Sequence, residues 1–557
     1  MIIRPRLLST VFISVVLGLS ACGSSKNSTS DSGDSVGSAA PSDSTVSGDT
    51  GPANTGAATG AVTSGKSIDT LRTAFYNDMQ VPDPDIFYEV EGNQVVMSTY
   101  EGLLRYKLGG TTDIEPLLAE SYTVSPDSLV YTFTLRPGVT FVDGTPFDSA
   151  AAKFSFERRV KVNNAPAYML TEVASLETPD PLTFVVKLKK PVAAFLDYLA
   201  CPYGPKMLSP ALIKAHDRGA DSAQEWLRTN SAGTGPYAIS EFTLGQRYVM
   251  TALPNYWGTK PTVGAVEISI VPDASTQTLQ LEGGDLDFLH ALPLATIEDF
   301  RSKQGFEVVT FPAFQKTQLK VNPNKAPFGD KTLRQALRQA IDRNKLIPEV
   351  FGDVATISTS LLPAGMLPAG MGKDDYTYDP APLKALVAKL PAAQRKLVMG
   401  YSQGNVNDAR LAESIGSALR DAGLEITIKP IPLAVIFDLR NTPDSAPNLL
   451  LETANPDASH PDTWARIFYN TEGFLNYVRG GVKSADAEMD LGLASVDVPT
   501  MQAHYAKAAD LLFEDATFLT MADVKAVYVV RKGLTGFGST AASPISLNVS
   551  GVTDSGS

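Results

Sequence analysis

A long segment with few bulky apolar residues, spanning positions 23–65, limits what this chain can fold into. It consists mainly of Ser, Gly, Thr, Ala and Asp and contains no aromatic residue. Such a segment buries too little apolar surface to offset the entropy of ordering, so we expect a flexible tether. Folding is then confined to the remaining residues, about 490, which are enough for more than one hydrophobic core.

The residues before this segment have the pattern of a secretory signal. Two arginines precede an apolar stretch at 11–19 that is too short to span a bilayer. The sequence Leu-Ser-Ala-Cys then ends at Cys22 and resembles the lipobox of bacterial lipoproteins, in which the cysteine thiol carries a lipid. We expect a signal peptide at 1–21, a lipidated Cys22 and a tether over 22–66. The protein is thus expected to lie outside the cytoplasm, anchored to the cell membrane.

Charge and composition exclude several function classes. The net charge of −13 and a pI near 5.0 argue against a nucleic-acid partner, whose phosphates would be repelled. With Cys22 lipidated, Cys201 has no partner for a disulfide and is expected to be a small buried residue. The four histidines form no metal motif, although a site assembled from distant positions is an alternative. We therefore expect neither a cofactor nor a metal.

Strand and helix patterns mix along the body. Alternating apolar residues predict strands at 131–136, 183–188, 266–271 and 425–429. Apolar residues at helical spacing predict helices at 333–341, 411–419 and 499–514. Asp330 is a suitable N-cap for the first of these helices, and Gly423 is suitable just after the end of the second. The class is mixed α/β, without a transmembrane segment.

One short motif suggests an enzyme. Gly400-Tyr-Ser-Gln-Gly404 fits the G-x-S-x-G nucleophile elbow of serine hydrolases. A second match at 33–37 lies in the expected tether, so a single match to this pattern is weak evidence for a hydrolase. An elbow also needs a helix directly after the serine, whereas the turn-rich stretch 405–408 indicates a helix cap several residues later. A hydrolase using Ser402 is therefore the minor alternative, and we expect no enzyme.

Several blocks together resemble one protein family. The longest is LAESYTVSPDSLVYTFTLRPGVTFVDGTPF at 118–147. The shorter blocks are GTGPY at 233–237, NYWG at 255–258, GDLD at 284–287, LRQALRQAIDR at 333–343 and HPD at 460–462. In these blocks the chain resembles the family 5 solute-binding proteins, which include the dipeptide-, oligopeptide- and nickel-binding components of ABC importers. The resemblance covers nearly all of 68–550.

The resemblance implies a two-lobed periplasmic-binding-protein clamp, or Venus flytrap, with an additional domain inserted in lobe one. By block order, we expect lobe one from 67–98, 233–314 and 526–550, the additional domain from 99–232, and lobe two from 315–525. The chain is expected to cross between the lobes in two adjacent hinge strands, near 310–322 and 525–530. Closure about such hinges is driven by contacts that the ligand makes in the closed state.

The resemblance also implies ligand contacts. Asp457 matches the acidic residue that receives the ligand's α-amino group in peptide-binding relatives, since a buried ammonium requires such an acceptor. The alternative is a turn-forming role after Pro456. The other ligand-binding residues expected are Tyr401, Ser402 and Gln403 in a lobe-two loop, Tyr88 and Glu89 in a lobe-one loop, and His460 and Trp464 beyond Asp457. For Glu89 the alternative is a solvated loop position, and for Trp464 it is core packing.

Two departures from the family leave the ligand open. Ala454 stands where many peptide binders have Trp, and the loop 401–405 lacks the Arg that some dipeptide binders use for the peptide carboxylate; Arg410 lies on the following helix. We expect a peptide or peptide-like solute, with a non-peptide solute (an opine, a glycoconjugate or a metal chelate) as the alternative. The expected partners are an ABC permease and its ATPase, and the protein is expected to be a monomer. A role in envelope assembly is a further alternative.

Overall fold

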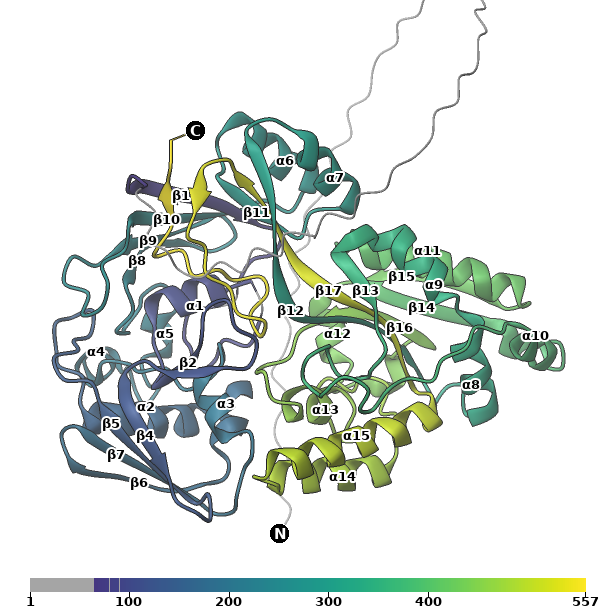
Figure 1. Cartoon of the computed structure of the whole chain (residues 1–557), viewed down its shortest axis with the longest axis horizontal. Coiled ribbons are helices and arrows are strands. Elements are labelled where there is room, and N and C mark those ends of the chain that lie inside the picture. The colour runs from purple at the N-terminus through teal and green to yellow at the C-terminus, as the bar shows by residue number, and fades with distance from the viewer. Residues whose placement is uncertain (1–64, 80, 90, 557) are drawn as a thin grey trace, which may run out of the picture. The chain divides into compact units, whose positions relative to one another are not determined.

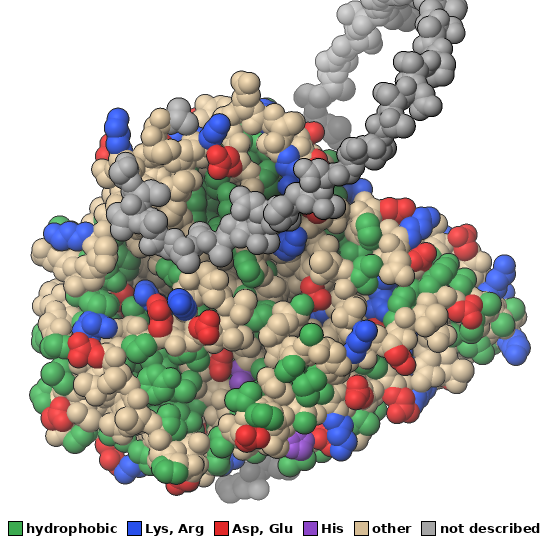
Figure 2. Space-filling view, in the orientation of Figure 1, with side chains coloured by type: hydrophobic (Ala, Val, Ile, Leu, Met, Phe, Trp, Pro, Cys, Tyr) green, Lys and Arg blue, Asp and Glu red, His purple; other side chains and the backbone are tan. Residues whose placement is uncertain are grey.

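The computed structural model describes residues 65–79, 81–89 and 91–556. The expected signal peptide, Cys22 and nearly all of the expected tether lie outside these residues. Within the described part, no helix combines the length and apolar character needed to cross a membrane. On the face shown in Figure 2, acidic and basic side chains are interspersed rather than gathered by sign.

Sheet one is built from segments far apart in the sequence. Its strands, in order, are β1 (Ile68–Phe75), β10 (Val263–Ile270), β9 (Arg247–Ala252) and β8 (Tyr237–Thr243). β1 is parallel to β10, while the other pairs are antiparallel. The core over this sheet also includes Ala526, Tyr528 and Val530 from near the C-terminus. These strands fall within the segments expected for lobe one.

Sheet two lies between β1 and β8 in the sequence, within the segment expected for the additional domain. Its order is β4 (Ala119–Val124), β5 (Val130–Leu135), β7 (Thr183–Leu188) and β6 (Val173–Asp180), all antiparallel. A hairpin of β2 (Leu104–Tyr106) and β3 (Ile114–Pro116) precedes it. α1 (Asn93–Thr99) lies at the end of the first segment expected for lobe one. The helices within the segment expected for the additional domain are α2 (Ser149–Val162), α3 (Phe195–Ala200), α4 (Pro210–His216), α5 (Gln224–Leu227) and the 3-10 helix η1 (Ala165–Leu170).

Sheet three is the largest, and two long strands run through it. Its order is β11 (Phe288–His290), β17 (Phe518–Arg531), β12 (Phe306–Val321), β16 (Leu449–Ala454), β14 (Lys396–Ser402) and β15 (Glu425–Ile431), and β13 (Ala355–Ile357) also pairs with β17. β12 and β17 are antiparallel, and their register shifts between Phe311 and Gln315. They are the two adjacent strands at which the chain was expected to cross between lobes (Figure 1).

Helices cover both faces of sheet three. One face packs on α8 (Lys331–Ala340), α9 (Arg343–Phe351) and α11 (Val406–Asp421). Another core contains α13 (Asp462–Phe468), α14 (Lys483–Ala494) and α15 (Val498–Asp515). The remaining elements are α6 (Ala274–Gly283), α7 (Leu294–Ser302), α10 (Ala381–Val387), α12 (Leu433–Asp438), η2 (Gly352–Val354), η3 (Ala392–Arg395), η4 (Pro443–Ser445), β18 (Leu534–Thr535) and β19 (Thr553–Asp554).

The sequence patterns located these elements well. The strands predicted at 131–136, 183–188, 266–271 and 425–429 are β5, β7, β10 and β15. The three predicted helices are α8, α11 and α15. The Asp330 side chain accepts a hydrogen bond from the Thr332 N–H, which confirms it as the cap of α8. Gly423 has a φ of 95° just after α11, a conformation that favours glycine. Cys201 is buried, as expected.

A buried ion cluster fixes the loop that follows β1. The Arg158 guanidinium on α2 lies 2.7 Å from Asp83 and 2.5 Å from Asp85, and all three side chains are at most 2% exposed. The neighbouring Arg159 also binds Asp85, at 2.9 Å. Because unpaired buried charges are costly, this cluster holds the loop firmly against α2.

We expect Arg158→Met to lower the free energy of unfolding by about 3–5 kcal/mol, because it leaves two buried carboxylates with fewer partners. Urea denaturation followed by circular dichroism measures the change. The matched control is Lys153→Met on the same helix, where a 3.8 Å ion pair with Glu157 is exposed to solvent. We expect this control to cost less than about 1 kcal/mol. Equal effects of the two substitutions would contradict the importance given to the buried cluster.

Candidate functional site

The candidate site begins at the carboxyl ends of three neighbouring strands. β14 pairs in parallel with both β15 and β16, and Tyr401 lies opposite Leu451 in β16. The ends of parallel strands open at one edge of a sheet, which is where ligands commonly bind in α/β folds. The loop 402–405 follows β14 and the turn 455–461 follows β16, so the expected residues of both segments leave sheet three at the same edge.

Asp457, in the turn after β16, is a buried carboxylate. Only 6% of the residue is exposed. Its Oδ2 atom accepts a 2.7 Å hydrogen bond from the Tyr168 hydroxyl and a further bond from the Tyr88 hydroxyl. Burial raises the pKa of Asp457 to about 6, although both hydrogen bonds act to lower it. A buried carboxylate of this kind can bind a positively charged group of a ligand.

The two hydroxyl donors come from regions far from Asp457 in the sequence. Tyr168 lies in η1, and Tyr88 lies in the loop that the Arg158 cluster holds. The Tyr203 ring lies 5.2 Å from the Tyr88 ring, and its hydroxyl donates to the Glu89 carbonyl oxygen at 2.8 Å. Tyr88, Tyr168 and Tyr203 thus form a tyrosine wall beside Asp457. The expected role of Tyr88 as a ligand contact stays a prediction.

An arginine lies beyond this tyrosine wall. The Phe474 ring meets the Tyr88 ring edge to face, with centroids 5.9 Å apart. The Arg440 guanidinium, just after α12, lies 4.4 Å from the Phe474 centroid. Among the described residues no carboxylate forms an ion pair with Arg440. Asp457 therefore contacts one member of the aromatic pair, Tyr88, and Arg440 contacts the other, Phe474.

His460 belongs to the same turn and is also buried. Its Nδ1 atom accepts a 3.1 Å hydrogen bond from the Asp462 N–H, while its Nε2 atom has no partner among the described residues. Burial lowers the pKa of His460, and the charges of Asp197 and Asp462 act against this. The preceding residue, Ser459, is also held in place, because its N–H donates to the Tyr106 hydroxyl at 2.8 Å. The turn is therefore docked firmly against the region of β2 and α3.

Other expected site residues lie elsewhere or remain untested. Trp464 is fully buried and donates from Nε1 to the Tyr469 hydroxyl at 2.8 Å, which favours its core-packing alternative. Tyr401 packs partly against the core of α8, α9 and α11. Ser402 is half-buried and Gln403 is exposed at the end of β14, and no contact joins either of them to Asp457. Their role as ligand contacts stays a prediction.

The elbow geometry around Ser402 is absent. α11 begins at Val406, with Asn405 as its cap, so three residues separate Ser402 from the helix. The turn-rich stretch 405–408 contains the cap, Asn405, as expected. However, α11 begins within this stretch, at Val406, rather than after it. Of the histidines that follow Ser402, His460 is bonded as above and His504 pairs with Glu488 at 2.7 Å. No described histidine hydrogen-bonds Ser402.

Sequence reasoning missed Tyr168, Tyr203 and Arg440. Tyr168 and Tyr203 lie in the region expected as the additional domain, and nothing in their local sequence indicates that they face a distant aspartate. Arg440 is one basic residue in a turn-rich stretch between β15 and β16. Only the folded structure brings these side chains to the site. Within the described ranges, no group of three or more His, Cys, Asp or Glu residues is arranged to hold a metal ion.

Comparisons with known proteins agree with this architecture. The family model of the bacterial extracellular solute-binding proteins, family 5 (middle region), matches residues 113–476. The chain is 26% identical over 468 residues to the probable D,D-dipeptide-binding periplasmic protein DdpA of Escherichia coli (strain K12), covering 83% of this chain and 89% of that one. It is 25% identical over 472 residues to the glutathione-binding protein GsiB of Salmonella paratyphi A, covering 82% and 89%.

Solved structures share the fold at low identity. The binding protein DppA from Helicobacter pylori, in complex with the peptide STSA, superposes with a TM-score of 0.77 at 20% identity, covering 88% of this chain and 98% of that one. NikZ from Campylobacter jejuni, in complex with Ni(L-His), gives a TM-score of 0.74 at 22% identity, covering 84% and 95%. The fold is thus the two-lobed clamp of periplasmic binding proteins, and the chain belongs to the family 5 bacterial extracellular solute-binding proteins.

Proposed function

We propose that this protein captures a peptide or peptide-like solute that carries an ammonium group and a carboxylate. The observation that carries the proposal is the buried Asp457 carboxylate, which is met by hydroxyls from two distant parts of the chain. Binding and release are the whole of its action, without bond-breaking chemistry. The expected domain boundaries are kept within this proposal: Asp457 belongs to lobe two (315–525), Tyr88 to lobe one and Tyr168 to the additional domain.

In this proposal the ligand's ammonium group binds Asp457. The hydroxyls of Tyr88 and Tyr168 turn toward the carboxylate as the lobes close, so that it keeps its hydrogen bonds while water leaves. An ammonium group pairs well with a desolvated carboxylate that is already held in place, and an unpaired one would be costly to bury. Contacts made only in the closed clamp are what shift the protein toward closure.

Arg440 receives the ligand's carboxylate in the same proposal. It takes the place of the arginine that the loop 401–405 lacks, and its guanidinium rests on Phe474, 4.4 Å from the ring centroid. Ser402 and Gln403, at the end of β14, offer neutral hydrogen-bonding groups to the ligand's backbone. The aromatic rings of Tyr88 and Phe474 then lie along the body of the ligand.

Delivery follows the pattern of ABC importers. The ligand passes to a membrane permease whose ATPase supplies the energy, so its affinity is moderate enough for release. A lipid on Cys22 anchors the monomeric binding protein to the membrane, outside the cytoplasm. Family membership supports the importer part of this proposal, while the anchor rests on the sequence pattern before residue 23.

We expect Asp457→Asn to weaken binding of an amine-bearing peptide more than about tenfold, because the amide keeps the shape of the side chain and removes its charge. The probe is the tightest binder found by native mass spectrometry in a pool of di- to tetrapeptides, and calorimetry gives its affinity. Asp444→Asn, at an exposed position in η4, is the matched control and should change nothing. Unchanged affinity in Asp457→Asn would refute the assigned role.

The affinity for the same peptide should fall as the pH falls through about 6, where Asp457 takes up a proton. Between pH 7 and pH 5 the loss should be roughly tenfold, because only the ionised carboxylate attracts the ammonium group. Burial raises the pKa of the neighbouring Tyr88, Tyr168, Tyr198, Tyr203 and Cys201, so these groups stay uncharged over this range. Calorimetry at several pH values tests this, and the pH effect should vanish in Asp457→Asn.

We expect Arg440→Gln to weaken binding of a peptide with a free C-terminus about tenfold and to leave its C-terminally amidated analogue unaffected. The reason is that the guanidinium pairs with a carboxylate that the amidated peptide lacks. Arg410→Gln on α11 is the control, because Arg410 is exposed and bonds weakly to the Glu349 carbonyl oxygen at 3.5 Å. Equal losses for both peptides in Arg440→Gln would place the ligand's carboxylate elsewhere.

A further inference from the structure

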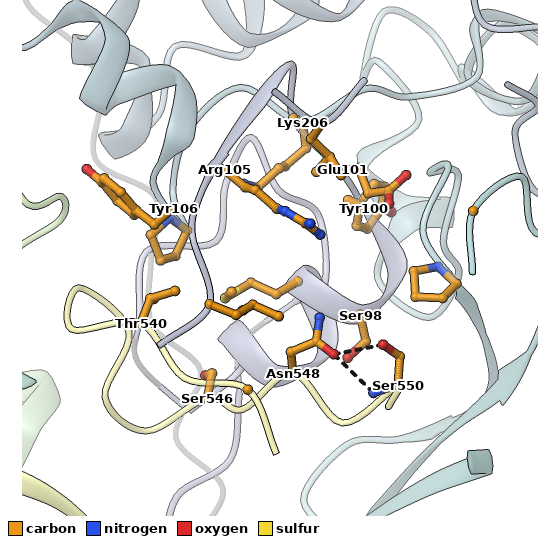
Figure 3. Close-up of a pocket in the computed structure, with 18 of the residues that line it drawn as sticks. Ser98, Tyr100, Glu101, Arg105, Tyr106, Lys206, Thr540, Ser546, Asn548 and Ser550 are labelled. Carbon is orange, nitrogen blue, oxygen red and sulfur yellow. Dashed lines mark hydrogen bonds between the residues drawn. The ribbon is translucent and has the colours of Figure 1, made fainter. Parts of the chain in front are cut away.

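A cavity of about 340 Å³ lies away from Asp457, in the region of sheet one and the β2–β3 hairpin. It is enclosed by the end of α1, by β2, by the segment 256–259 and by the C-terminal segment 538–550 (Figure 3). No residue from 315–525 lines it, and neither do Tyr88, Tyr168 and Tyr203. The cavity and the candidate site therefore differ in their lining residues, although Tyr106, which lines the cavity, binds the Ser459 N–H of the Asp457 turn.

The acidic side chain in the cavity wall is already fully engaged. Glu101 is 6% exposed and accepts hydrogen bonds from the Tyr256 hydroxyl at 2.6 Å, from Trp257 Nε1 at 2.8 Å and from the Thr234 hydroxyl at 2.8 Å. These three donors hold the carboxylate in the wall, so it offers little to a cationic ligand.

Hydrogen-bond donors, by contrast, are left over. Arg105 uses its Nε to bind Glu115 at 2.7 Å, and its terminal nitrogens have no partner among the described residues. Figure 3 shows the guanidinium directed toward the middle of the cavity. The Asn548 Oδ1 atom accepts from the N–H and hydroxyl of Ser550, at 3.1 and 2.7 Å, which leaves its amide nitrogen toward the cavity. The Ser546 hydroxyl is buried and has no partner within the described part of the chain.

A second cation strengthens the positive character of this wall. Lys206 is 6% exposed, and its Nζ atom donates to the Cys201 carbonyl oxygen at 2.9 Å. No described carboxylate forms an ion pair with it, and burial lowers its pKa to about 8. An anion in the cavity would be attracted by the Arg105 guanidinium and would stabilise the charged form of Lys206. The apolar part of the wall comes from Met97, Leu104, Leu108 and Leu547.

We propose that this cavity is a second ligand site, which binds a small organic carboxylate with an apolar body. The Arg105 guanidinium pairs with the carboxylate, the Asn548 amide nitrogen donates a hydrogen bond to it, and the apolar wall covers its hydrocarbon part. The proposal does not rest on the peptide-binding function assigned to Asp457. It gives the chain a binding capacity that a solute held between the lobes does not explain.

Hexanoate and phenylacetate are the probes, with hexylamine as a cation of similar size, and calorimetry measures binding to the purified chain. We expect saturable binding of a carboxylate and none of the amine. Arg105→Gln should weaken carboxylate binding about tenfold or more. The control Glu115→Gln breaks the same ion pair but keeps the guanidinium, so its affinity should be unchanged or higher. Arg440→Gln should bind the carboxylates as the unaltered protein does.

Three results would overturn the second site. The first is no saturable binding of either carboxylate below ~10 mM, which is weaker than specific small-molecule sites usually show. The second is equal losses in Arg105→Gln and Glu115→Gln, which would point to damage of the β2–β3 hairpin rather than a lost ligand contact. The third is loss of binding in Arg440→Gln with Arg105→Gln unaffected, which would assign the carboxylates to the proposed ligand-carboxylate position at Arg440.

Discussion

The antiparallel pairing of β12 with β17 is the interaction on which the rest of the fold depends. One end of the pair, with Ala526 and Tyr528, contributes to the core over sheet one. The other end, with Leu319 and Leu519, contributes to the core of α8, α9 and α11. Two cores therefore share one strand pair, and the irregular register between Phe311 and Gln315 lies between them. A bend at that point would change the relation of the cores while each stays packed.

Two buried lysines fix how β12 sits in its sheet. Lys316 and Lys320 are fully buried and pair with Asp523 in β17 and Glu452 in β16, the first at 2.8 Å. Burial lowers the pKa of both lysines, and each carboxylate partner acts to restore it. A slip of one residue would turn both ammonium groups toward the apolar face that holds Leu319. Such a slip is prohibitive, so the carboxyl edge that carries Asp457 keeps its register.

The sequence was informative where local pattern decides structure and silent where distant segments meet. Alternation in 183–188 predicts β7 because a half-buried strand requires it. Asp457 was identified through its place in a family pattern, and the structure adds the hydroxyls that surround it. Tyr168 and Arg440 could not be predicted, because hydrophobic periodicity does not show which side chains will lie near a given turn. Tyr168 is hundreds of residues away from the Asp457 turn in the sequence, and Arg440 is separated from it by one strand. Trp464 illustrates the opposite case: the sequence suggested it as a site residue, whereas its burial favours core packing. A large aromatic residue near a site is equally suited to either role.

The shared strand pair also constrains when the core over sheet one can form during synthesis of the chain. β1 is completed within the first residues of the folded body, yet its core needs Tyr528 and Val549 from near the C-terminus. Synthesis proceeds from the N-terminus, so the apolar residues of sheet one stay without their final partners until almost the whole chain has been translated. Lys66 and Asp554 exchange backbone hydrogen bonds, which join the two ends of the folded body once the chain is complete. The core over sheet one is thus completed only late in the synthesis of the polypeptide, after the other cores have all of their residues.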